Sequence, residues 1–288
     1  MRLSRCMKIF RTAVGPLSVL AAMALLIPVA GAQTVDSVMS TPVFNNSVFA
    51  NSYVTSGATA TINGDVLSGL YFTTGAGATI SGNATAVAAT TLGASSILSG
   101  DVRSGSATTL GAGAIVDGNI VSGTTTTFGA GAGSSTNLNL YPTAPSVILD
   151  QGEVMTAQAY LSGLDSNFTV LPGNIATDIT FTPGVHKVTG LLTVTAGMTI
   201  TLDATNDVDA EFIFNISNYL AFGANVNVVV KNGTPSTRVI WNAGNYISVG
   251  AGANIIGTVM AHGYVSTGAT STVPGPARTL GGYGEMGC

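Results

Sequence analysis

The sequence predicts an all-β solenoid, a stack of similar coils, accompanied by one helix. The main observation is a Gly-Ala pair that recurs every eighteen residues, followed seven residues later by a second glycine. The pairs stand at Gly57-Ala58, Gly75-Ala76, Gly93-Ala94, Gly111-Ala112 and Gly129-Ala130. A fixed period of this length is typical of coils that stack on their neighbours.

Apolar side chains keep the same period and should fill the inside of the stack. Ile62, Ile80, Leu98 and Val116 form one such column. The repeated glycines are expected at the corners of each coil, where we expect a positive φ angle. Three short strands per coil then give three faces, because side chains alternate inward and outward along each strand.

We divide the chain into a signal peptide, residues 1–32, and a single solenoid domain, residues 33–288. A basic head of four residues, Arg2, Arg5, Lys8 and Arg11, precedes the apolar run of residues 19–29, and Ala30-Gly31-Ala32 resembles a cleavage site. A transmembrane anchor is the alternative, but the run is shorter than the roughly 20 residues that a span needs. The protein is therefore expected to be secreted, extracellular or attached to the cell surface, without a membrane partner after cleavage.

Composition limits the function classes. After loss of the signal, five basic residues remain against thirteen acidic ones, so nucleic acid is not an expected partner. Only Cys6 and Cys288 occur, and Cys6 leaves with the signal, so no internal disulfide is possible. Cys288 is either a dimerising thiol or an incidental terminal residue.

The domain is expected to contain early coils at residues 53–138, a linker and helix at 139–165, and late coils at 175–278. For the helix, Asp150 is a suitable N-cap, with Glu153 three residues later. Val154, Ala157, Leu161 and Leu164 share one helical face. The eighteen-residue period returns at Gly250 and Gly268, so the two sets of coils should belong to one stack.

One face of the stack carries a column of hydroxyl side chains, two residues before each Gly-Ala glycine. Its members are Thr55, Thr73, Thr91, Thr109, Thr127, Ser248 and Ser266. The strand preference of threonine is one explanation of this column. The other is a flat, uncharged template that orders water at the coil spacing, about 4.7–4.9 Å. The other two faces mix polar and apolar groups, so either could carry the helix.

The second half resembles the microbial ice-binding proteins, which fold as a discontinuous β-solenoid with one flanking α-helix. The resemblance rests on the segments Phe181-Thr182-Pro183-Gly184-Val185-His186, Asp209-Ala210-Glu211-Phe212-Ile213-Phe214 and Val239-Ile240-Trp241-Asn242. It implies a right-handed solenoid of triangular cross-section with the helix packed alongside, and adsorption to ice through a face rich in Thr, Ser, Ala and Gly. The family motif Thr-(Ala/Gly)-x-(Thr/Asn) is matched by Thr267-Gly268-Ala269-Thr270, but not at Leu92, Leu110 or Phe128.

No catalytic residue, metal site or cofactor is predicted, and the protein is not expected to be an enzyme. His186 and His262 lack metal-ligand neighbours and are interpreted as structural or surface residues. Asp203, Asp207 and Asp209 either bind calcium or form a turn between strands. Acyltransferases with hexapeptide coils and solenoid polysaccharide-cleaving enzymes are weaker alternatives, because no motif places a catalytic histidine or a carboxylate groove.

The resulting hypothesis is a secreted antifreeze-type repeat protein whose partner is the ice surface and which inhibits recrystallisation. The alternative is a structural or adhesive cell-surface solenoid that self-associates through its coil ends. Open strand edges favour such association unless they are capped, and residues 33–52 and 279–288 are the expected caps.

Overall fold

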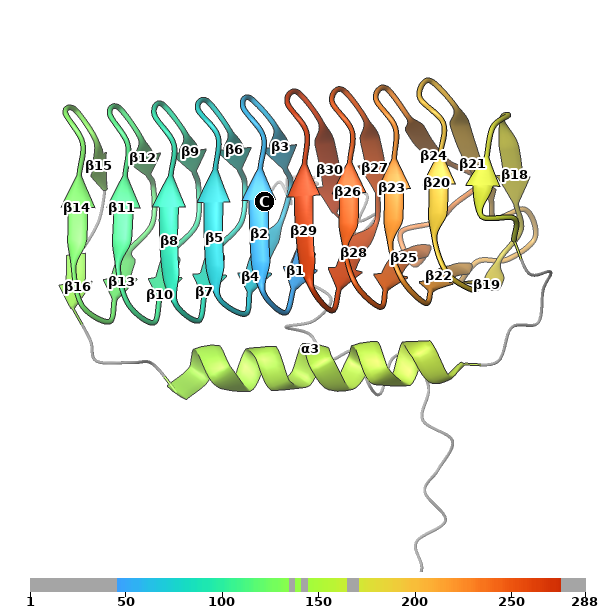
Figure 1. Cartoon of the computed structure of the whole chain (residues 1–288), viewed down its shortest axis with the longest axis horizontal. Helices are drawn as coiled ribbons and strands as arrows, with labels where there is room; N and C mark the ends of the chain where they lie inside the picture. Colours follow the sequence, from blue (N-terminus) through green and yellow to red (C-terminus); the bar gives the residue numbers. More distant parts are fainter. Residues whose placement is uncertain (1–45, 135–137, 141–144, 165–170, 276–288) are drawn as a thin grey trace, which may run out of the picture. The chain divides into compact units, whose positions relative to one another are not determined.

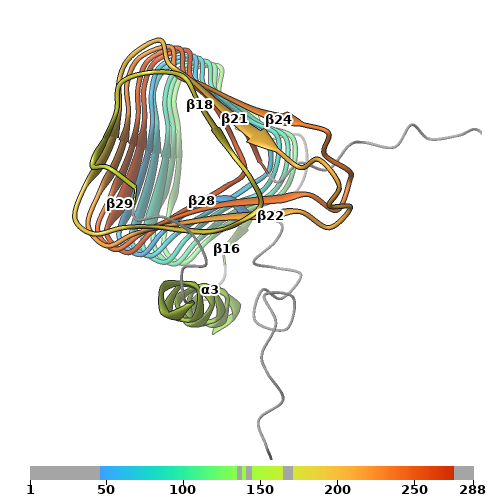
Figure 2. The same ribbon diagram turned by 90° about the vertical axis from the view of Figure 1, so that its right-hand side faces the viewer.

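The computed structural model describes residues 46–134, 138–140, 145–164 and 171–275. They belong to one compact unit, Val38–Cys288. The expected signal peptide, the expected cap at 279–288 and Cys288 lie outside the described residues. Within the unit, every coil supplies one strand to each of three sheets, and each sheet contains ten parallel strands. The expected all-β solenoid is confirmed, and Figure 2 shows its triangular section.

Sheet A carries the helix. In spatial order its strands are β16 (Leu138–Leu140), β13 (Ile120–Ser122), β10 (Val102–Ser104), β7 (Ala84–Ala86), β4 (Asp65–Ser68), β1 (Asn46–Ala50), β28 (Thr258–Ala261), β25 (Arg238–Ala243), β22 (Glu211–Ile216) and β19 (Gly184–Val188).

Sheet B contains the threonine column. Its strands are β14 (Thr126–Phe128), β11 (Thr108–Leu110), β8 (Ala89–Leu92), β5 (Tyr71–Thr74), β2 (Tyr53–Ser56), β29 (Tyr264–Thr267), β26 (Ile247–Val249), β23 (Leu220–Phe222), β20 (Leu192–Val194) and β17 (Asn174–Ile175).

Sheet C closes the section. Its strands are β15 (Gly133–Ser134), β12 (Ile115–Val116), β9 (Ile97–Leu98), β6 (Thr79–Ile80), β3 (Thr61–Ile62), β30 (Thr272–Gly275), β27 (Asn254–Ile256), β24 (Asn227–Lys231), β21 (Thr199–Asp203) and β18 (Ile179–Phe181).

The two ends of the solenoid chain meet in the middle of the stack (Figure 1). Strands β1, β2 and β3 pair with β28, β29 and β30, so the early and late coils form one continuous stack. The expected cap at residues 33–52 is therefore wrong where it is described, because Asn46–Ala50 is a central strand of sheet A. The ends of the stack are instead β14–β16 and β17–β19.

The expected positive φ is found at some of the second repeated glycines, Gly64, Gly257 and Gly275. The glycines of the Gly-Ala pairs are instead required by close approach of stacked backbones: a Cβ added to Gly75 would lie 2.5 Å from the backbone nitrogen of Ala58 in the neighbouring coil. In these turns the positive φ angle falls two residues after the first glycine, as at Thr59 and Gly77. The glycine column thus allows coils to stack at strand spacing through the turn.

The interior changes character along the stack. The early coils bury aliphatic residues such as Leu92 and Leu110. They also bury hydroxyl side chains that bond one another between coils, as Ser104 Oγ does to Thr90 Oγ1 at 2.8 Å. The late coils bury an aromatic stack in which the ring of Phe214 lies 4.1 Å from that of Trp241 and 4.9 Å from that of His186.

The helix α3 (Pro145–Gly163) packs on sheet A, against β22 and β25 (Figure 2). Of the apolar face expected from sequence, Val154, Ala157 and Leu161 are buried, whereas Leu164 lies just after the helix and is half-buried. The expected start is wrong: the helix begins at Pro145, whose fixed φ suits a first helical turn, so Asp150 lies inside it.

Candidate functional site

The seven hydroxyl residues predicted from sequence lie in one straight row across sheet B. Successive pairings align Thr127 with Thr109, Thr109 with Thr91, Thr91 with Thr73 and Thr73 with Thr55. The row then crosses to the late coils, where Thr55 pairs with Ser266 and Ser266 with Ser248. The five threonines are exposed and the two serines are half-buried. We call this set the hydroxyl row.

The row continues into coils where the sequence period did not reveal it. Ser248 pairs with Ala221, Ala221 with Thr193, and Thr193 with Asn174. These residues were missed because longer turns at 204–210 and 232–237 interrupt the eighteen-residue period. A search for the outward position before each late Gly-Ala pair, such as Gly223-Ala224, finds Ala221.

A second outward row lies two residues before the first, on the same face of sheet B. In the early coils it contains small residues, Ala89, Ala107 and Thr125. In the central coils it contains tyrosines, beginning with Tyr71, which pairs with Ala89 on one side and Tyr53 on the other. Sheet B therefore carries small side chains in this row near β8, β11 and β14, and tyrosine rings near β5, β2, β29, β26 and β23.

Sheet B is the one sheet of the three whose described strands contain no Asp, Glu, Lys or Arg. Sheet A carries Asp65, Arg103, Lys187, Glu211 and Arg238, and sheet C carries Asp203 and Lys231. Register shifts occur in one pairing of sheet A and one of sheet C. The described pairings of sheet B contain none, so its outward rows stay in register from coil to coil.

The helix leaves sheet B uncovered, because α3 packs on the face that carries Leu67 and Arg103. Of the two mixed faces, this one takes the helix. The first residue of the family motif at Thr267–Thr270 does not lie on the outer face of sheet B. Thr267 points inward and is 5% exposed, with its Oγ1 accepting a hydrogen bond from the Gly57 amide at 3.4 Å.

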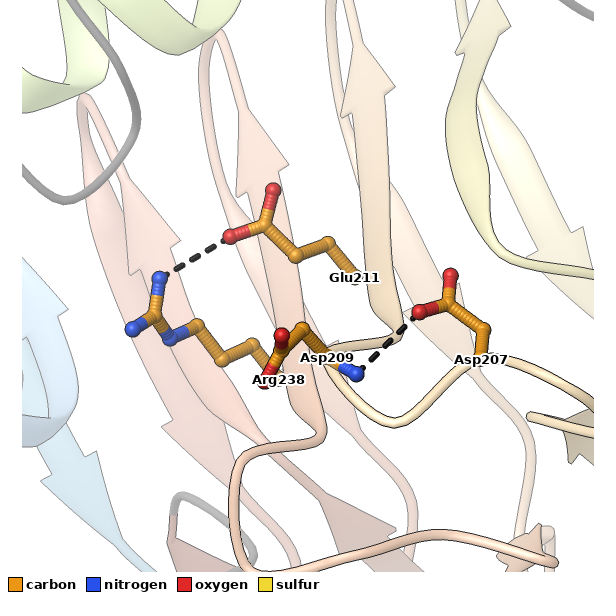
Figure 3. Close-up of polar contacts among 4 residues, drawn as sticks. All are labelled: Asp207, Asp209, Glu211 and Arg238. Atoms are coloured by element: carbon orange, nitrogen blue, oxygen red, sulfur yellow. Dashed lines mark hydrogen bonds and ion pairs between the residues drawn. The ribbon is translucent and has the colours of Figure 1, made fainter.

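The acidic segment of the late coils is a set of turns (Figure 3). The Asp209 amide donates to Asp207 Oδ1 at 3.1 Å, and Arg238 forms an ion pair with Glu211 at 2.9 Å. Hydrogen bonds from Thr205 and Asn232 lower the pKa of Asp203. Among the described residues no three His, Cys, Asp or Glu side chains are grouped so that they could hold a metal ion. The turn interpretation is supported by the hydrogen bonds within the segment, from the Asp209 amide to Asp207 and from the Thr205 amide to Asp203.

The two histidines have different surroundings. His186 lies in the core beside Phe181 and Phe214, and its Nε2 is 3.0 Å from the carbonyl oxygen of Thr182. Burial lowers its pKa. His262 is exposed, immediately after β28. Neither lies in the hydroxyl row.

The three-sheet fold, interrupted by α3, places the chain in the class of discontinuous β-solenoids with one flanking helix, and its sheet B is uncharged in the described strands. Residues 141–282, just under half of the chain, match the model of the Ice-binding-like family, in agreement with the resemblance noted in the sequence. No curated protein sequence matches the chain significantly.

Several solved structures are similar in fold. An ice-binding protein from an Antarctic biological consortium has a TM-score of 0.48 and 18% identity, with 85% of this chain and 94% of that chain covered. One from the Antarctic ascomycete Antarctomyces psychrotrophicus has a TM-score of 0.47 and 17% identity, over 81% and 95% of the two chains. An ice-binding protein domain from Shewanella frigidimarina has a TM-score of 0.43 and 17% identity, also over 81% and 95%. In the part of the chain that is described, no helix is long and apolar enough to cross a membrane.

Proposed function

We propose that this protein is an ice-binding protein of the antifreeze type and that sheet B is its contact surface. The observation that carries the proposal is the alignment of seven hydroxyl residues on the sheet whose described strands are free of charge. The ice-contact residues are Thr55, Thr73, Thr91, Thr109, Thr127, Ser248 and Ser266.

The proposed mechanism is physical adsorption. Strands stack about 4.7–4.9 Å apart, so the row repeats a hydroxyl and a methyl group at this interval. The hydroxyls hold water, while the methyls and the neighbouring alanines restrict where that water lies. Charged groups would orient water around themselves, and the described strands of sheet B contain no charged residue. Adsorbed molecules pin the ice front, which curves between them and grows less readily.

The adhesive, self-associating solenoid is not favoured by the family match. Self-association could act through the outermost strands at β14–β16 and β17–β19. It is tested by sedimentation of the purified protein over a range of concentrations. We also propose export through the signal at residues 1–32, which mass analysis of the mature N-terminus would test at Gln33.

The test of ice binding is a matched pair of substitutions. Thr109→Arg places a long, charged side chain in the middle of the hydroxyl row. Thr79→Arg makes the same change in sheet C, where Thr79 is half-buried at the surface. We expect the purified wild type to shape ice and to show thermal hysteresis, Thr109→Arg to lose both, and Thr79→Arg to keep both. An inactive wild type, or equal activity of the two variants, contradicts the proposal.

A further inference from the structure

Five tyrosines form a ladder along the edge of the hydroxyl row. Tyr71 pairs with Tyr53, and Tyr53 with Tyr264. The ring of Tyr264 lies 4.8 Å from that of Tyr246, which lies 4.7 Å from that of Tyr219, with 3° between the planes in both pairs. The Tyr53 and Tyr71 rings are 5.6 Å apart at 13°. The tyrosine ladder thus spans β5, β2, β29, β26 and β23.

Ring stacking covers part of the aromatic surface of the ladder. Tyr246 is stacked between Tyr219 and Tyr264, and Tyr53 is stacked on Tyr71, yet Tyr53 remains 47% exposed and Tyr264 40%. A platform that stacks sugar rings needs free aromatic faces, and Tyr246, at the middle of its stack, has a ring on both sides. What the ladder offers along its length is a row of phenol groups repeating at the strand spacing.

The position of the ladder connects it to the hydroxyl row. Each ladder residue stands two positions before a member of the hydroxyl row or, for Tyr219, before Ala221 in its continuation, as Tyr53 does before Thr55 and Tyr264 before Ser266. Residues two apart on a strand point to the same side of the sheet. Each of the five rings is stacked on at least one neighbouring ring, so the phenols have less freedom than isolated surface tyrosines.

We propose that the tyrosine ladder is a second ice-contact row, parallel to the hydroxyl row. This inference rests on the proposed ice-binding function and assigns to it five residues, Tyr71, Tyr53, Tyr264, Tyr246 and Tyr219. Their hydroxyls extend the ordered water sideways across the central coils. The early coils, where Ala89 and Ala107 take the corresponding positions, contact ice through the threonines alone.

The competing role is a rim. Tyrosine is much longer than threonine, so the ladder could instead bound the contact surface and keep ice away from the central coils. The two roles make opposite predictions. A contact row loses activity when the hydroxyls are removed, whereas a rim leaves activity unchanged or raises it when the rings are cut back.

The experiment removes the phenol groups and keeps the stack. In the full chain, Tyr53→Phe, Tyr246→Phe and Tyr264→Phe are combined, and Tyr160→Phe on α3 is the control outside the ladder. We expect the triple variant to lose thermal hysteresis and recrystallisation inhibition at equal concentration, with an unchanged circular dichroism spectrum, and the control to match the wild type. Unchanged or raised activity in the triple variant overturns the proposal.

Two further measurements distinguish failure of the ladder proposal from a folding defect and from failure of the proposed function. If the triple variant is less folded, Tyr246→Phe alone is used, and equal activity to wild type then overturns the ladder's role. Thr109→Arg separates the two proposals, because it tests ice binding by sheet B without touching the ladder. If Thr109→Arg is inactive while the phenylalanine variants are fully active, the ladder is refuted and the proposed function stands. If Thr109→Arg keeps full activity, the proposed function itself fails.

Discussion

The early and late coils both contribute strands to sheet B, but their interiors differ. The early coils, residues 46–134, keep an eighteen-residue period and fill their core with aliphatic side chains and bonded hydroxyls. The late coils, residues 171–275, lengthen two turns, bury the ring stack of His186, Phe214 and Trp241, and carry the contacts with α3.

The family match falls on the helix and the late coils, whereas the five threonines of the hydroxyl row lie in the early coils. In the late coils the same row contains Ser266, Ser248, Ala221 and Thr193. The family match therefore covers the helix and the late coils but not the five threonines. The surface that we propose for ice follows from the stacking register, which both halves share.

The largest expected effect is on the late core. Trp241→Ala removes a fully buried ring and the hydrogen bond from its Nε1 to the carbonyl oxygen of Ile256 at 2.9 Å. We expect a loss of about 3–5 kcal/mol in the free energy of unfolding, measured by chemical denaturation. Leu92→Val in the early core is the comparison and should cost much less. Equal losses would mean that the aromatic stack is no more important than the aliphatic column.

The early core is tested through its buried hydroxyls. Thr108 Oγ1 donates to Ser104 Oγ at 3.0 Å and accepts from Ser122 Oγ at 2.7 Å. Thr108→Val keeps the shape and leaves both serines without this partner, so we expect a loss of about 1–3 kcal/mol. Thr109→Val, next to it on the outer face, is the control and should change the stability by less than about 0.5 kcal/mol. A loss for Thr108→Val no greater than that of Thr109→Val would mean that the buried hydroxyl groups do not stabilise the early core.

A smaller, pH-dependent effect is expected in the late core. Burial lowers the pKa of His186 in the folded protein, while the unfolded chain keeps a value of about 6.5. The unfolded state therefore binds more protons between the two values. Stability should be complete above about pH 6.5 and decrease as the pH falls toward the folded value. Denaturation of the wild type and His186→Phe across this window should differ in slope; parallel curves would show that His186 does not titrate differently on unfolding.

The smallest effect on stability, within about 0.5 kcal/mol, is expected when the late row is made like the early one. Combining Ala221→Thr, Ser248→Thr and Ser266→Thr gives the late coils the threonines of the early coils. If the row is the contact surface, thermal hysteresis should increase at equal concentration. Two serine-to-threonine changes and one alanine-to-threonine change away from sheet B serve as the control, and an equal increase there would mean that the row is not the cause.

Much of the architecture followed from periodicity. The eighteen-residue interval places Thr55 through Thr127 in one column, and a matching interval adds Ser248 and Ser266. Periodicity could not reveal Tyr219, Ala221 or Thr193, because the turns at 204–210 and 232–237 change the coil length. Nor could it show that β2 pairs with β29, since that contact depends on packing between distant segments. The start of α3 was misplaced because Asp150 and Glu153 resemble a capping box.

The junction of β2 with β29 joins segments far apart in the chain, as the contact between Gly57 and Thr267 illustrates. Closing so long a loop has a conformational entropy cost that precedes any gain from pairing, which slows folding. The two halves can each form by stacking neighbouring coils, so the junction of β2 with β29 should form last. A molecule in which β2 and β29 have not yet paired would present two short hydroxyl rows instead of one long row. Ice should then bind the fully folded protein more strongly than this partly folded form.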